Sequence, residues 1–174
     1  ESDSVDSLSS CCRLRNQRDA QEFSQSLGSG GVSTGSLGVI TLNFNRFVQT
    51  HPQDALEDAL RNTIRRMHAY LIAFRRHIEE LIQQGALSIY TGGFIHIHKQ
   101  FLTIGINGLL EAAEFLGYTA SNNPDYIAWI ARQLAIIKEE NQLATQRTGY
   151  KFNTECVPAE NLGVKNATWD KQDG

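Results

Sequence analysis

The chain has 174 residues, of which 41% are hydrophobic and 20% charged, as expected for one globular domain. A net charge of −3 gives no general attraction to nucleic acid or to an anionic membrane surface. No apolar run reaches the ~20 residues of a membrane span, and residues 1–4 lack the basic start of a signal peptide. The first residue is not methionine, so we expect an interior fragment of a longer protein. We expect that protein to be located in the cytoplasm.

The first feature with chemical meaning is a pair of adjacent cysteines, Cys11 and Cys12, beside Arg13 and Arg15. The only other cysteine is Cys156, and an odd count argues against a secreted disulfide framework. Nearby cations lower the pKa of a thiol and favour reactive chemistry. The alternative is that these cysteines are small buried side chains, which the local sequence alone favours.

Residues 1–31 show no helical or strand period and are predicted to form a loop. The glycine-rich run 28–38 follows. Its backbone N–H groups could hold a phosphate, or the run could be a flexible turn. It lacks the Gly-Lys-Ser/Thr ending of a P-loop, which excludes a nucleotidase of that kind.

The rest of the chain alternates between predicted strands and helices. The elements that we expect are a strand at 39–44, a long helix at 53–84 capped by Gly85, a strand at 94–98 if that segment is extended, a short helix at 109–116, a second long helix from Pro124 to Gly149, and a strand at 152–157. The tail 161–174 is polar, with no closing element expected. This alternation predicts an α/β layer or barrel with parallel strands, whose sites gather at strand ends.

Charged and histidine side chains in these elements have two possible readings. The arginines that flank the apolar stripe of the first long helix (Arg61, Arg65, Arg66, Arg75 and Arg76) are predicted to be a solvated face rather than a binding patch. Residues 138–140, Lys-Glu-Glu, are predicted to be the wet face of the second long helix. His96 and His98 could ligate a metal, but no third ligand lies at a usual local spacing.

Five segments in order carry a likeness to a known family. They are SSCCRLR at 9–15, GSLGVITLN at 35–43, GFIHIHKQFLTIGING at 93–108, EAAEFLG at 111–117 and FNTECVPAENLGVKN at 152–166. On these motifs the chain resembles the catalytic subunit of class III, oxygen-sensitive anaerobic ribonucleoside-triphosphate reductase, a glycyl-radical enzyme. It departs from the family at residues 43–46, Asn-Phe-Asn-Arg, where Asn-Leu-Pro-Arg is usual.

The resemblance implies a fold and an activity. The fold is part of a ten-stranded α/β barrel of the glycyl-radical type, with two long helices. Residues 1–174 would be one fragment of that catalytic domain, with the cysteine finger loop and glycine-rich loop at 1–38 and the strands and helices at 39–174. The activity is reduction of ribonucleoside triphosphates to 2′-deoxyribonucleoside triphosphates by thiyl-radical chemistry, for DNA replication.

The resemblance also implies the site residues. Cys12 would lie at the tip of the finger loop and carry the thiyl radical, with Cys11 as the second choice. Ser36, Gly35 and Asn43 would contact the substrate. The segment 158–160, Pro-Ala-Glu, would form part of the wall of the site.

The remaining implications concern the intact protein. Its glycyl radical and a zinc site would lie outside this segment, so the chain alone should be inactive. The reductant would be formate or a dithiol protein, and Leu14 near Cys12, in place of an acidic group, favours formate. A radical SAM activating enzyme, ATP binding and a homodimer are also expected, with no membrane contact. Two other hypotheses are a non-catalytic helical interaction module, and a metal site of His96, His98 and the cysteines.

Overall fold

The computed structural model describes residues 8–9, 15–16, 35–157 and 162–173. Near the amino end, β1 (Leu8–Ser9) and β2 (Arg15–Asn16) pair antiparallel. The other elements, in chain order, are β3 (Ser36–Asn43), α1 (Phe44–Thr50), the 3₁₀ helix η1 (Gln53–Ala55), α2 (Leu56–Gln83), α3 (Ser88–Thr91), the 3₁₀ helix η2 (Ile97–Lys99), β4 (Phe101–Asn107), α4 (Leu109–Phe115), α5 (Pro124–Thr148), β5 (Lys151–Cys156) and α6 (Leu162–Asp173).

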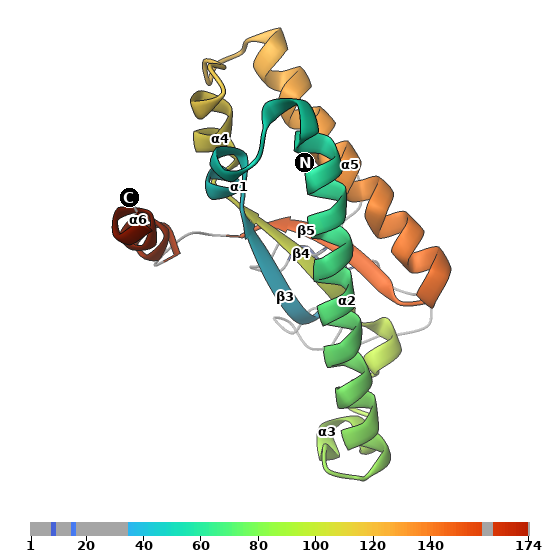
Figure 1. Ribbon diagram of the computed structural model, residues 1–174. Coiled ribbons are helices and arrows are strands. Elements are labelled where there is room, and N and C mark those ends of the chain that lie inside the picture. Colours follow the sequence, from blue (N-terminus) through green and yellow to red (C-terminus); the bar gives the residue numbers. More distant parts are fainter. Residues whose placement is uncertain (1–7, 10–14, 17–34, 158–161, 174) are drawn as a thin grey trace.

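β3, β4 and β5 form one parallel sheet in that order, with β4 in the centre. Helix α2 lies in the connection from β3 to β4, and α5 lies in the connection from β4 to β5. Both connections cross the sheet in the same direction, so both long helices cover the same face. Figure 1 shows α2 and α5 over that face, and they contact each other and the sheet. The predicted α/β class with parallel strands and two long helices is confirmed.

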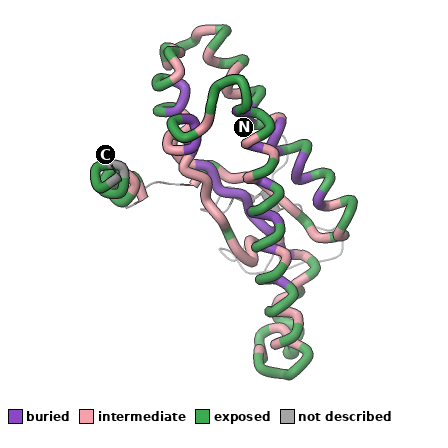
Figure 2. The backbone as a smooth tube through the Cα atoms, in the orientation of Figure 1, coloured by how far each residue is buried: buried purple, intermediate pink, exposed green. Residues whose placement is uncertain are grey.

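The core lies between this face of the sheet and the two long helices. Every second side chain of β4 (Leu102, Ile104 and Ile106) is at most 2% exposed and belongs to this core. The helices contribute apolar stripes, which comprise Leu56, Leu60, Ile64, Met67 and Leu71 from α2 and Ile136 and Ile137 from α5. Figure 2 shows the buried residues along the central strand and on the inner sides of both helices. Full burial of one such side chain contributes about 1.5–3 kcal/mol, so this layer is the main source of stability.

The ends of the long helices follow the predicted capping signals. Gly85 (φ 75°) follows the C-cap of α2, and Gly149 (φ 73°) is the C-cap of α5, each in the left-handed conformation that glycine tolerates. Asn123 caps the start of α5 by accepting a hydrogen bond from the backbone N–H of Asp125, with Pro124 in the first turn. No helix in the described part of the chain is both long and apolar enough to cross a membrane.

Three segments differ from the sequence prediction. The predicted strand at 39–44 begins three residues earlier, at Ser36, within the predicted glycine-rich run. It ends one residue earlier, because the side chain of Asn43 accepts a hydrogen bond from the backbone N–H of Arg46 and starts α1. The segment 94–98 is not a strand: η2 begins at Ile97, and β4 begins only at Phe101. The polar tail carries a helix, α6, most of whose described side chains are exposed, so it has little of the apolar period that predicts a helix.

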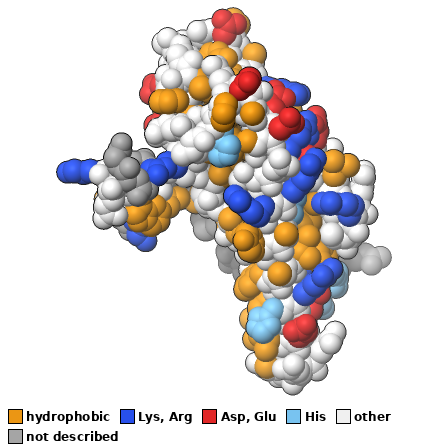
Figure 3. All heavy atoms as spheres, viewed as in Figure 1, with side chains coloured by type: hydrophobic (Ala, Val, Ile, Leu, Met, Phe, Trp, Pro, Cys, Tyr) orange, Lys and Arg blue, Asp and Glu red, His pale blue; other side chains and the backbone are white. Residues whose placement is uncertain are grey.

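An ion-pair cluster between α2 and α5 corrects two further predictions. Glu140 is 1% exposed, and its carboxylate accepts hydrogen bonds from Arg65 (2.8 Å from both Nε and Nη2) and from Arg61 (3.2 Å). Burial alone would raise the pKa of Glu140, but the two guanidinium groups outweigh burial and lower it. Figure 3 shows acidic and basic side chains gathered on this part of the surface. Glu140 is therefore not on a solvent-exposed face of α5. Arg61 and Arg65 are not simply solvated but connect α2 to α5.

Arg75 is a second exception to the predicted solvated arginine face. Its side chain is buried on α2, donates to Glu79 at 2.9 Å, and lies over the ring of Tyr150 at 4.2 Å. The Tyr150 hydroxyl donates to the same carboxylate at 3.1 Å. This cluster attaches the residue just before β5 to the carboxyl half of α2.

Candidate active site

A row of polar side chains crosses the sheet on the face opposite α2 and α5. Ser36 of β3 lies 2.7 Å from Thr103 of β4, between the two hydroxyl oxygens. Thr103 donates to the side-chain oxygen of Asn153 on β5 at 2.7 Å, and the Asn153 amide donates to Glu155 at 3.4 Å. We call these four residues the polar row. Their alternation with the core residues of β4 and β5 places them on the other face of the sheet.

The hydrogen bonds of the polar row are continuous across the three strands. The Ser36 hydroxyl donates to the carbonyl oxygen of Gly38 at 3.0 Å, and the Thr103 hydroxyl donates to Asn153. Either hydroxyl can be the donor in the contact between Ser36 and Thr103, because two hydroxyl hydrogens serve these three contacts. The row thus connects a serine hydroxyl to a carboxylate, and a lone pair of the Ser36 oxygen remains able to accept a hydrogen bond.

Glu155 is the ionisable end of the polar row. Partial burial raises the pKa of its carboxyl group, and the Asn153 hydrogen bond lowers the pKa by less. On the same face of β5 lies Lys151, whose amino group is 5.8 Å from the centre of the Phe101 ring. Gly105 and Thr41, the residues in register with Glu155 on β4 and β3, carry no charge. Glu155 therefore holds a proton at higher pH than an ordinary glutamate does.

Gly105 leaves space that its neighbours fill. A Cβ atom at this position would lie 2.6 Å from the Thr41 hydroxyl oxygen and 2.7 Å from a methyl carbon of Val157. Both neighbours are β-branched and stiff at χ1, so neither can turn away easily. Only glycine lets Thr41 of β3 and Val157, the residue after β5, come together here.

Gly105→Ala is expected to lower the free energy of unfolding by about 1–3 kcal/mol, because overpacking displaces Thr41 and Val157. Urea unfolding followed by circular dichroism measures this loss. Gly163→Ala in α6 is the matched control, because a Cβ there meets nothing within 4 Å. An equal stability of the two variants would show that the face around Gly105 is loosely packed.

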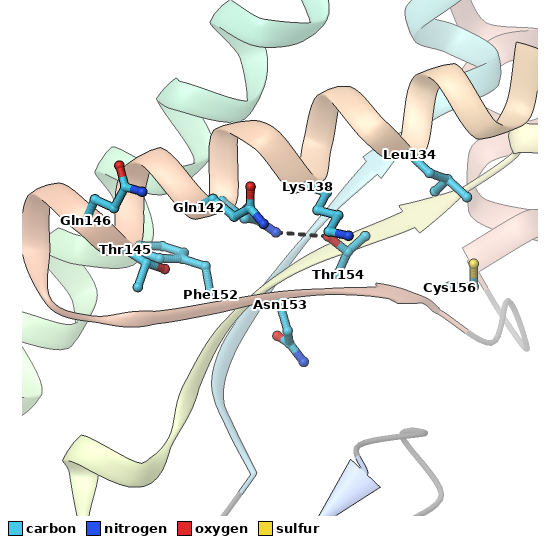
Figure 4. Close-up of a pocket in the computed structure, with 10 residues that line it drawn as sticks. Leu134, Lys138, Gln142, Thr145, Gln146, Phe152, Asn153, Thr154 and Cys156 are labelled. Carbon is cyan, nitrogen blue, oxygen red and sulfur yellow. Dashed lines mark hydrogen bonds between the residues drawn. The ribbon is translucent and has the colours of Figure 1, made fainter. Parts of the chain in front are cut away.

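A cavity of about 780 Å³ lies between α5 and β5. Lys138, Asn141 and Gln142 of α5, together with Thr154 and Cys156 of β5, contribute to its lining. Figure 4 shows Asn153 pointing to the other side of the strand from Thr154, and both residues line the cavity, which therefore reaches the polar row at Asn153. The exposed Cys156 thiol belongs to this cavity and not to the polar row.

Comparisons with known proteins decide which family this sheet belongs to. The family model for anaerobic ribonucleoside-triphosphate reductase matches residues 1–173. The chain belongs to that family. The alternative hypothesis of a non-catalytic helical module is therefore not favoured. A search among curated proteins found no match.

Solved structures of anaerobic ribonucleotide reductase share the fold. The Thermotoga maritima enzyme with glycerol in the active site is 30% identical over 98% of this chain and 29% of that chain, with a TM-score of 0.79. The same enzyme with citrate in the active site is 29% identical over 74% of this chain and 25% of that one, with a TM-score of 0.69. Its complex with dATP and CTP is 29% identical over 74% of this chain and 23% of that one, with the same TM-score. The chain thus spans about a quarter of the length of these reductases.

The structure of this reductase chain separates the three predicted substrate contacts within the described residues. Ser36 belongs to the polar row. Gly35 precedes it with φ 149°, and its carbonyl oxygen accepts from the backbone N–H of Phe101 at 2.8 Å. Asn43 lies at the far end of β3, roughly 23 Å away at ~3.3 Å per residue, where its side chain caps α1. The substrate role of all three residues stays a prediction.

Cys11 and Cys12 lie outside the described residues, as do residues 158–160. In the sequence, the two cysteines fall between β1 and β2, which pair antiparallel with Ser9 opposite Arg15. The flanking residues of the proposed finger loop are therefore held next to each other. The roles of Cys12 and Cys11 stay predictions.

The two histidines considered as metal ligands stack on each other. The rings of His96 and His98 are 5.4 Å apart at an interplanar angle of 29°. Among the residues that the structure describes, no group of three or more His, Cys, Asp or Glu side chains is arranged to hold a metal ion.

Thr103, Asn153 and Glu155 are the members of the polar row that sequence reasoning missed. Thr103 carried a signal, because it is the polar side chain between Leu102 and Ile104 in an apolar strand and so marks the second face. Asn153 and Glu155 carried a weaker sequence signal, because Thr154 between them is also polar and hides the alternation of polar and apolar residues.

Proposed function

We propose that this chain is part of the catalytic domain of an anaerobic reductase that converts ribonucleoside triphosphates to 2′-deoxyribonucleoside triphosphates. The observation that carries the proposal is the family match over residues 1–173, which includes the cysteine pair and every strand of the sheet. The polar row supports it by presenting hydroxyl, amide and carboxyl groups on the side of the sheet that α2 and α5 leave uncovered.

The sheet also supports the proposed ten-stranded barrel. Its strands are parallel and added in one direction, with both long helices outside, as in barrels whose helices surround the strands. Within the described residues β3 and β5 are edge strands, so each can pair with a further strand. In this arrangement residues 1–38 supply the finger loop and the glycine-rich run, whose last three residues begin β3, and residues 39–174 supply strands and helices of the wall.

Cys12 is proposed to carry the reactive radical, with Cys11 as the second choice. A glycyl radical elsewhere in the intact subunit supplies the oxidising equivalent. The Cys12 sulfur then takes the 3′ hydrogen of the ribose and later returns it, because S–H and activated C–H bonds are similar in strength. The work of the chain is to position this sulfur against the substrate and to shield it.

The polar row is proposed to bind the ribose and to donate a proton to the departing 2′ hydroxyl. Ser36 can accept a hydrogen bond from a sugar hydroxyl while its own hydroxyl hydrogen is donated to the Gly38 carbonyl oxygen. Departure of the 2′ hydroxyl as water requires a proton. Glu155, whose pKa is raised by burial, can hold that proton at a higher pH than an exposed carboxyl group. The row therefore joins substrate binding to acid catalysis.

Glu155→Gln in the intact reductase is expected to lower kcat by about 100- to 10,000-fold, the usual contribution of a general acid. The wild-type rate should fall as the pH rises through the raised pKa of Glu155, because the protonated form is the active one. The rate of the variant should not show this fall with rising pH. Glu114→Gln, on the exposed side of α4, is the matched control and should keep full activity. If Glu155→Gln kept both the wild-type kcat and the fall of the rate with rising pH, Glu155 would be excluded as the acid.

The partners of the intact enzyme follow from the family and are also proposed. The substrates are ribonucleoside triphosphates, and ATP and deoxynucleotides are proposed effectors. A radical SAM enzyme activates a cytoplasmic homodimer. Formate or a dithiol protein is the reductant. Zinc is proposed to lie in another part of the subunit.

A direct assay tests the activity. The intact subunit, activated under anaerobic conditions, is incubated with CTP and either formate or a reduced dithiol protein, and dCTP is quantified by chromatography. Formation of dCTP with one of these reductants supports the proposal. An activated subunit that carries the glycyl radical, yet forms no deoxynucleotide from any of the four ribonucleoside triphosphates, contradicts it.

A further inference from the structure

A buried chain of hydrogen bonds links both long helices to β5. His68 of α2 is 1% exposed, and its Nε2 lies 2.7 Å from the side-chain oxygen of Asn141 on α5. Because that oxygen is an acceptor, Nε2 carries the hydrogen and donates. The Asn141 amide then donates to the hydroxyl of Thr154 on β5 at 2.9 Å, the bond drawn in Figure 4. We call these three residues the β5 anchor.

The β5 anchor holds the opposite face of β5 from the polar row. Phe152 and Thr154 face the helices, and the ring of His68 meets that of Phe152 edge-on at 4.6 Å. Asn153 and Glu155 alternate with them and face the polar row. Any movement of Thr154 along or away from α5 therefore moves Asn153 and Glu155 on the other face.

Polar contacts suit this task better than apolar ones. A hydrogen bond weakens steeply when its length or angle changes, whereas an apolar contact tolerates sliding. A slip of one residue in a strand would exchange its two faces. Burial lowers the pKa of His68, which keeps the ring neutral with one donor nitrogen. Its other nitrogen, Nδ1, has no hydrogen-bond partner among the described residues, so stability alone does not account for a histidine here.

We infer that His68 and Asn141 are positioning residues, which act through the Thr154 hydroxyl to hold Asn153 and Glu155 in place on the substrate side of β5. The inference deepens the proposed function, since it assumes that the polar row meets the substrate. It assigns a task to residues of two helices that lie on the far side of the sheet from that row.

The test compares Thr154→Val with Thr154→Ser in the intact reductase. Valine has nearly the shape of threonine but cannot accept the Asn141 hydrogen bond, whereas serine keeps the hydroxyl. We expect Thr154→Val to lower kcat by about 10- to 100-fold, the effect of a misplaced catalytic group, with little change in KM. Thr154→Ser should retain kcat. His68→Phe, which keeps the ring contact with Phe152, should behave like Thr154→Val.

A second readout separates this inference from the proposed function. Carbodiimide labels protonated carboxyl groups, and peptide mass spectrometry gives the pH midpoint for labelling of Glu155. Thr154→Val and His68→Phe should shift that midpoint from its raised value toward that of an ordinary glutamate, while Thr154→Ser should not. A shifted midpoint with unchanged kcat would support the anchor and contradict the catalytic role of the polar row. An unchanged midpoint in both variants, even with a lower melting temperature, would overturn the inference.

Discussion

Cys12→Ser in the intact reductase is expected to abolish deoxynucleotide formation, with a loss of at least about 1,000-fold, as for removal of a reacting nucleophile. The O–H bond of serine is much stronger than the S–H bond of cysteine. A serine at this position therefore cannot exchange a hydrogen atom with the ribose at a useful rate. The change replaces one sulfur atom with oxygen and adds no bulk, so folding should be kept. Conversion of CTP to dCTP by the anaerobically activated enzyme measures the loss.

The other two cysteines of the chain are the matched controls. Cys11→Ser changes the neighbouring thiol, and Cys156→Ser changes the exposed thiol that lines the cavity between α5 and β5. Both variants should retain activity within a fewfold of the wild type if Cys12 carries the radical. If Cys11→Ser lost activity and Cys12→Ser retained it, the radical would be assigned to Cys11. Activity in both single variants would contradict a thiyl radical at this pair.

The long helices were predictable because their signals are local. The apolar residues of α2 recur every three or four positions. Gly85 and Gly149 mark helix ends through backbone conformation, and Asn123 marks one through its capping side chain. The parallel sheet followed from the alternation of these helices with apolar strands. The misread helices lack such signals. Helix α1 depends on one capping side chain, Asn43, and α6 shows little apolar period.

The candidate site was harder to predict because it depends on contacts between distant residues. Ser36 was predicted, but its partner Thr103 lies 67 positions away. The register shift between Ser36 and Gly38 inserts one residue in β3, which sequence spacing does not reveal. Glu140 was misread for a similar reason. A Lys-Glu-Glu run is usually solvated, and only the packing of α2 on α5 brings two arginines to it.

Glu140→Ala is expected to lower the free energy of unfolding by about 2–3 kcal/mol, somewhat less than the usual cost of breaking a buried ion pair. The change removes the acceptor of three hydrogen bonds from Arg61 and Arg65. The cost is reduced because the Arg65 side chain is 50% exposed and can be hydrated again. Urea unfolding of the chain at neutral pH, followed by circular dichroism, measures the change.

Glu139→Ala is the matched control, because Glu139 also pairs with Arg61, at 2.7 Å, but is 48% exposed. Its loss should cost no more than about 1 kcal/mol. The pH dependence gives an independent check. Because the folded-state pKa of Glu140 is lowered, its stabilising effect is present above its unfolded-state pKa and is lost as the pH falls through the folded-state value. The difference between wild type and Glu140→Ala should therefore shrink in acid. A difference that stays constant across this range would mean that Glu140 stabilises the contact between the helices through packing and not through its charge.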